Sequence, residues 1–145
     1  MKPLLGAWQL WAVLSAVFAA LTAIFAKIGV ENVNSDLATF IRTIVVILVL
    51  AGILVATGEW QPPATISGRT YLFLLLSGLG TGASWLCYFR ALQLGDAARV
   101  APIDKLSVVL VALFGAGFLG ERLSAVNWLG VAAIAGGALL VVYRG

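Results

Sequence analysis

Apolar residues dominate five stretches of the chain, and short polar segments separate them. Each stretch is close to the roughly 20 residues that an α-helix needs to cross the hydrocarbon core of a bilayer. The predicted spans cover residues 7–28, 37–57, 70–92, 98–119 and 125–143. The pattern therefore predicts an all-α, multi-pass membrane protein with a single domain, of the type found in the bacterial inner (plasma) membrane.

Hydroxyl side chains recur along one face of the third predicted span. Their spacing of four, three and four residues forms a continuous stripe on a helix, made of Ser77, Thr81, Ser84 and Tyr88. Trp85 borders this hydroxyl stripe. In the first span Ser15 and Thr22 are seven residues apart and share a face. We expect all of these residues to line a substrate cavity, although a helix-packing face accounts for Ser15 and Thr22 equally well.

Three charged residues lie inside predicted spans and away from their last or first two residues or so. Asp104 and Lys105 are adjacent, about one turn into the fourth span, and Arg42 is in the second turn of the second span. A charge at the centre of a lipid-facing helix costs roughly 2.5–3.5 kcal/mol on an insertion scale. Arg42 and Asp104 are expected at similar depth, and an ion pair between them would lower this cost. Lys105 points about 100° away from Asp104 on a continuous helix.

Each of these charges has an alternative interpretation. Arg42 can be an interfacial anchor whose charged end reaches toward the headgroups. Asp104 can couple transport to a proton or cation, because the pKa of a sheltered carboxyl moves toward neutrality. A purely structural ion pair is equally compatible with the sequence. We also expect a charged vestibule at the end of the bundle where the first span ends and the second begins. Its residues would be Lys27, Arg42, Arg90, Asp104 and Lys105.

Glycine spacing predicts where helices approach one another. Gly78 and Gly82 form a G-x-x-x-G pair in the third span, and Gly130 and Gly137 contribute to a small-residue face in the fifth. We expect both faces to pack against helices of this chain or of a second copy. Pro102 is near the start of the fourth span, where its missing N–H costs little.

Composition supports a membrane protein and excludes several kinds of chemistry. The chain is 62% hydrophobic and only 10% charged, against roughly 25% charged residues in soluble domains. It has no histidine, so histidine metal sites and histidine-dependent catalytic triads are excluded. It also has no phosphate-binding glycine loop. We therefore expect no enzymatic activity, no metal and no cofactor.

The charge distribution gives only a weak prediction of orientation. The net charge of +3 is carried at span ends, which indicates control of topology and not nucleic-acid binding. At the span ends or beyond them, three basic residues (Lys2, Arg69 and Arg122) lie on the N-terminal side and four (Lys27, Arg90, Arg99 and Arg144) on the other. This bias mildly favours a cytoplasmic C-terminus, and insertion in both orientations is compatible with it.

Several short motifs resemble one membrane family. They are Phe25-Ala26-Lys27, Ile41-Arg42, Tyr88-Phe89-Arg90-Ala91-Leu92 with Gly95, Val100-Ala101-Pro102, Ser107, Leu119-Gly120-Glu121, Trp128-Leu129-Gly130 and Gly136-Gly137. Together they resemble the EamA-type domain of the drug/metabolite transporter superfamily over essentially the whole chain.

The resemblance implies an architecture and a function. Members commonly carry two five-helix repeats of opposite orientation within ten helices, and this chain is similar to one repeat. It implies a homodimer, most simply antiparallel, that exports a small metabolite or drug-like solute by alternating access. The superfamily's small multidrug exporters use an acid in their first helix, which this chain lacks between Ala7 and Ile28. The alternative is a non-transporting scaffold or accessory subunit that pairs with another membrane protein.

Overall fold

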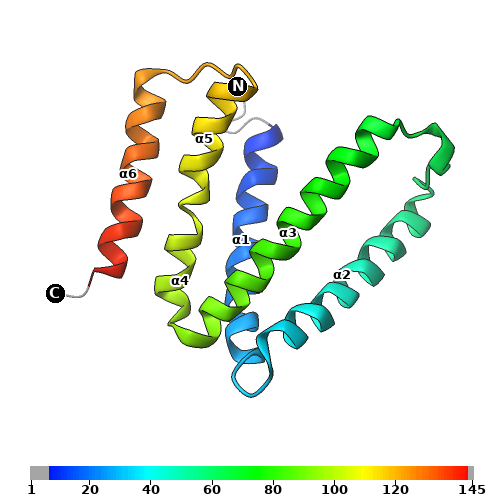
Figure 1. The fold of residues 1–145 in the computed structure, drawn as a ribbon, viewed down its shortest axis with the longest axis horizontal. Coiled ribbons are helices and arrows are strands. Elements are labelled where there is room, and N and C mark those ends of the chain that lie inside the picture. Colours follow the sequence, from blue (N-terminus) through cyan, green and yellow to red (C-terminus); the bar gives the residue numbers. More distant parts are fainter. Residues whose placement is uncertain (1–6, 144–145) are drawn as a thin grey trace. The chain divides into compact units, whose positions relative to one another are not determined.

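The computed structural model describes residues 7–143, and all regular structure within them is helical. The elements in order are α1 (Ala7–Gly29), α2 (Ser35–Thr57), the short 3-10 helix η1 (Pro63–Thr65), α3 (Gly68–Leu94), α4 (Ala97–Asp104), α5 (Ser107–Phe118) and α6 (Ala125–Val142) (Figure 1). Five segments are long and apolar enough to cross a membrane, with α4 and α5 together forming the fourth. The predicted all-α fold with five spans is confirmed.

The chain divides into two compact units, one ending at Leu94 and the other beginning at Gly95. In the first unit, α3 packs against both α2 and α1. The C-terminal ends of α1 and α3 come together with the N-terminal end of α2 (Figure 1). The buried side chains of this unit are all at that end, and they are Ala23, Ala26, Val30, Ser35, Thr39, Phe89 and Leu92. The helices expose most of their other apolar side chains, as expected of surfaces that contact lipid or another helix.

Local hydrogen bonds determine where α2 begins. Asn34, Ser35 and Asp36 are all able to cap a helix, and the structure uses Asn34. Its side-chain oxygen accepts hydrogen bonds from the backbone N–H groups of Asp36 (2.9 Å) and Leu37 (3.1 Å). The buried Thr39 hydroxyl donates to the Ser35 carbonyl at 2.8 Å. The buried polar residues Ser35 and Thr39 therefore both have hydrogen-bonded hydroxyl groups.

The second unit contains α4, α5 and α6, and α6 packs against both other helices. The sequence predicted one continuous helix over residues 98–119, with Pro102 harmless near its start. Instead, Pro102 lies inside α4, and the helix is interrupted between Asp104 and Ser107. Proline has no N–H for the carbonyl four residues earlier. After it the chain tightens into i→i−3 hydrogen bonds, in which Leu106 donates to Ile103 and Val108 donates to Lys105, both at 3.0 Å.

The connection between α5 and α6 is tightly built. The Gly115 carbonyl accepts hydrogen bonds from the backbone N–H groups of Leu119 (3.2 Å) and Glu121 (3.0 Å). This turn requires the left-handed backbone of Gly120, whose φ is 69°. Ser124 then caps α6 in a reciprocal arrangement with Asn127.

Candidate functional site

Two long polar side chains hold the end of α3 against the connection between α1 and α2. The Lys27 Nζ donates to the Leu92 carbonyl at 2.8 Å. The Gln93 amide donates to the carbonyls of Val33 (3.0 Å) and Val30 (3.3 Å). Carbonyls in the last turn of a helix lack intrahelical partners, and a cation is favourable beside them. These contacts fix the relative position of the three helices around a pocket.

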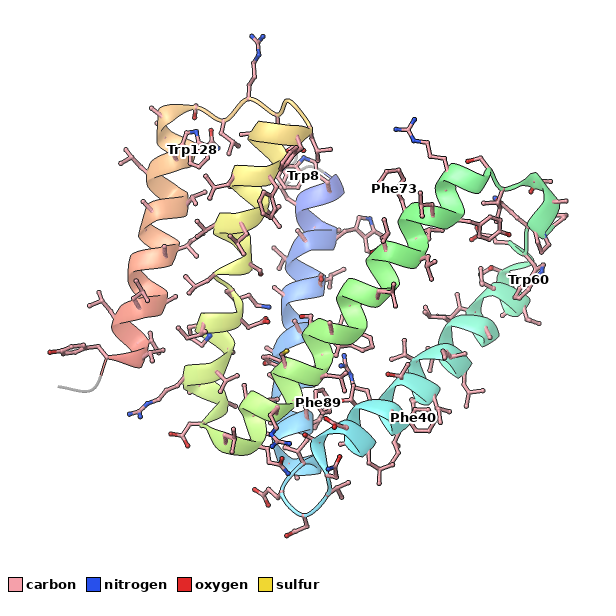
Figure 2. All side chains as sticks on the ribbon, viewed as in Figure 1. Trp8, Phe40, Trp60, Phe73, Phe89 and Trp128 are labelled. Atoms are coloured by element: carbon pink, nitrogen blue, oxygen red, sulfur yellow. The ribbon has the colours of Figure 1, made fainter. Side chains whose placement is uncertain are left out.

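The pocket lies between α1, α2 and α3 and has a volume of about 370 Å³. Its lining comes from the end of α1, the following connection, the start of α2 and the last third of α3, and consists of Thr22, Phe25, Ala26, Gly29, Val33, Ala38, Ile41, Arg42 and Phe89. We call it the Arg42 pocket. Figure 2 shows Phe89 at the end of α3 that lies nearest to the start of α2. The lining is apolar except for Thr22 and Arg42.

Arg42 is the only charged residue of this lining and is half-buried. Its Cζ lies 4.1 Å from the centroid of the Trp85 ring and 5.3 Å from that of Phe89. Such cation–π contacts stabilise by about 0.5–2 kcal/mol. Within residues 7–94 no carboxylate lies within 4.0 Å of the guanidinium, and the side chain of Tyr88 is an electrostatic neighbour of it. The rings therefore offset only part of the cost of placing this charge in an apolar site.

The hydroxyl stripe lies outside this pocket. Ser77, Thr81 and Ser84 are exposed on α3, and Tyr88 is half-buried. The Thr81 hydroxyl donates to the Ser77 carbonyl of its own helix at 2.9 Å, so part of the stripe is satisfied locally. The assignment of the stripe to a substrate cavity stays a prediction.

The other predicted cavity residues are divided. Thr22 is in the pocket lining, whereas Ser15 is exposed on α1. Trp85 is half-buried and lies beside the Arg42 guanidinium. Sequence reasoning missed the apolar lining and the contact of Arg42 with the two rings. Trp85 and Phe89 are four residues apart and share a helix face, which is a signal that a pair of rings was available to a cation.

Asp104 and Lys105 meet at the interruption between α4 and α5. The Lys105 Nζ lies 3.1 Å from the Asp104 carboxylate, although a continuous helix would direct the two side chains about 100° apart. The pairing of Asp104 with Arg42 stays a prediction, and so does the shared charged vestibule. Lys2 and Arg144, used in the orientation argument, are outside the described residues.

The glycines predicted to mediate packing have open surroundings. A Cβ atom built on Gly78, Gly82, Gly130 or Gly137 would meet no described heavy atom within 4 Å, neighbouring backbone of the same helix aside. These faces are therefore not filled by close helix contacts among the described residues of their own unit. Their role in packing against a second chain stays a prediction.

Comparison with known sequences gives consistent family matches. The EamA-like transporter family matches residues 6–143. An uncharacterized transporter encoded in the cobO 3' region of Sinorhizobium sp. is 69% identical over 134 residues, which cover 92% of this chain and 95% of that protein. The uncharacterized transporter YxxF of Bacillus subtilis (strain 168) is 25% identical over 142 residues, or 97% of this chain but only 44% of that protein.

A match over a shorter stretch involves a protein named as a flippase subunit. The probable 4-amino-4-deoxy-L-arabinose-phosphoundecaprenol flippase subunit ArnE of Yersinia pestis (strain Pestoides F) is 33% identical over 84 residues. The match covers 58% of this chain and 74% of ArnE. No solved structure matches the chain.

Proposed function

Since this chain belongs to the EamA-like transporter family, and is thus an integral membrane transporter and not an enzyme, we propose that it moves a small solute outward by alternating access around the Arg42 pocket. The observation that carries this proposal is the pocket itself. It lies between three candidate membrane-spanning helices, and its mostly apolar lining contains one positive charge, that of Arg42. Ligand sites of about 300–1,000 Å³ with few polar groups are typical of small-molecule binding.

We further propose that two copies pair in opposite orientations. The segment matched in the Bacillus subtilis relative occupies 44% of that protein, which leaves room there for a second segment of similar size. Transporters with inverted repeats place substrate between their halves, near the bilayer midplane. A second copy would also cover the hydroxyl stripe, whose exposed hydroxyls otherwise face hydrocarbon. The weak charge bias between the two sides supports insertion in both orientations.

Asp104 is the proposed coupling residue. It lies where a membrane-spanning segment is interrupted, and interrupted helices are common at the ion sites of transporters. The Lys105 Nζ lies 3.1 Å from its carboxylate, so a coupling cation bound at Asp104 would compete with that pair. Solute flux that responds neither to Asp104→Asn nor to the proton gradient would remove the coupling role and leave the pocket untouched.

Transport is tested with a variant whose new side chain fills the Arg42 pocket without clashing with the backbone. Gly29 lines the pocket, and a Cβ built there meets no described heavy atom within 4 Å, neighbouring backbone of the same helix aside. Gly52, in α2 and outside the lining, has equally open surroundings and provides the matched control. Proteoliposomes loaded with a bacterial metabolite extract are followed by mass spectrometry of the retained solutes.

We expect at least one solute to leave faster through the wild-type and Gly52→Leu proteins than through Gly29→Leu. If no solute leaves faster than from protein-free vesicles, the transport proposal fails. Antiparallel pairing is tested separately with reporters fused at the C-terminus, which should give signal on both sides of the membrane. Signal on one side alone would exclude it.

The ArnE similarity favours a second candidate function. ArnE is named as a subunit of a flippase, so this chain is a candidate accessory subunit that pairs with a different membrane protein. Under this alternative the purified chain shows no flux on its own, whereas an isolated antiparallel homodimer does.

A further inference from the structure

We infer that the Arg42 pocket selects an amphiphilic anion, meaning a phosphate or carboxylate group joined to an apolar body. This inference rests on the proposal that the pocket is the substrate site and adds the chemical class of the ligand. The argument begins with the guanidinium. Arginine carries five N–H donors in one plane, and a ring beside that plane accepts none of them along its edge.

The aromatic contacts therefore position Arg42 without satisfying its donors. Its Cζ lies 4.1 Å from the Trp85 centroid and 5.3 Å from that of Phe89. Within residues 7–94 no carboxylate lies within 4.0 Å of the guanidinium, and the electrostatic neighbour of Arg42 there is the side chain of Tyr88. Two oxygens of a carboxylate or a phosphate match such a group with two parallel hydrogen bonds, and these charge-assisted bonds are stronger than neutral ones.

The rest of the lining determines what is attached to the anion. Thr22 is the only other polar side chain in it, while Phe25, Val33 and Ile41 present apolar surface. A sugar or a free phosphate would lose hydrogen bonds to water here and find few replacements. An alkyl or aromatic body would instead be removed from water favourably. The volume of about 370 Å³ equals that of about a dozen water molecules, which suits a short-chain amphiphile.

Monooctyl phosphate is the probe, with 1-octanol and inorganic phosphate as its two halves. The full chain is placed in phosphatidylcholine nanodiscs, and binding is measured from the rise in unfolding temperature with ligand concentration. We expect monooctyl phosphate to bind at least tenfold more tightly than either half. Arg42→Gln should remove this preference, and Arg42→Lys should keep part of it, because lysine retains charge without the planar fork.

Gly29→Leu keeps the arginine and fills the pocket, so it should weaken monooctyl phosphate binding at least tenfold, while Gly52→Leu should bind like the wild type. This pair keeps the test decisive if Arg42→Gln does not fold. Nanodiscs that contain phosphatidic acid identify the source of the ligand. Competition with monooctyl phosphate would support the inference and indicate a lipid headgroup. No competition, with the preference for monooctyl phosphate over both halves retained, would support the inference and indicate a soluble amphiphile.

Two results would overturn the inference. One is equal binding of 1-octanol and monooctyl phosphate. The other is loss of folding in Arg42→Gln that Asp104→Asn restores, because the arginine would then serve an internal ion pair. The proposed function is affected differently. Flux that Gly29→Leu abolishes, together with no preference for the anion, would leave transport standing and reject only the ligand class.

Discussion

Gln93 offers the sharpest test of how the first unit is held together. Its amide donates to the Val33 carbonyl at 3.0 Å and to the Val30 carbonyl at 3.3 Å, bridging the end of α3 to the connection after α1. Interhelical hydrogen bonds in a membrane protein contribute about 0.6 kcal/mol each on average. The Val33 bond is exposed and the Val30 bond part-buried, so water replaces the first more readily. We therefore expect Gln93→Leu to lower the free energy of unfolding by about 1 kcal/mol.

A second glutamine provides the matched control. The Oε1 atom of Gln9 is buried and has no hydrogen-bond partner among the described residues. Gln9→Leu makes the same chemical change but removes an unsatisfied group, so stability should stay constant or rise by up to about 1 kcal/mol. Both variants are unfolded in dodecyl maltoside micelles by added sodium dodecyl sulfate, and circular dichroism follows the helices. If Gln93→Leu is no less stable than Gln9→Leu, the bridge does not contribute to the stability of the unit.

Two further predictions concern the second unit. Gly120→Ala should destabilise by about 1–2 kcal/mol, because an L-residue is strained at a φ of 69°; Gly117→Ala, inside α5 with open space for a Cβ, should be neutral or stabilising by up to about 1 kcal/mol in the same unfolding assay. An equal effect of both changes would contradict the turn geometry. Pro102→Ala restores a donor inside α4 and should extend regular helix across the interruption. Amide hydrogen exchange at residues 105–109 should then slow, and unchanged exchange would show that the proline does not cause the interruption.

The sequence was sufficient for those features that depend on local properties. Five apolar stretches predicted five spans, because length and hydropathy alone decide whether a helix can cross a bilayer. Candidate caps were also visible, and the competition among Asn34, Ser35 and Asp36 was settled by backbone geometry in favour of Asn34. The fourth span is present, but the sequence reasoning did not predict its interruption between Asp104 and Ser107. Pro102 lies beyond the first turn of α4, where its missing N–H removes a hydrogen bond of the helix.

The candidate site, by contrast, depends on how helices are rotated and tilted against one another. Periodicity placed Ser77, Thr81 and Ser84 on one face of α3 but did not say what that face meets, and in the structure it is exposed. Arg42 was recognised as a charge in need of shelter, yet its aromatic neighbours come from α3, more than forty residues later in the chain. The apolar sequence therefore determined that five membrane-spanning segments form and in which part of the chain each one lies. Only side-chain packing at the buried end of the first unit decided which residues surround the arginine, because periodicity shows which residues of one helix share a face but not which face of another helix they meet.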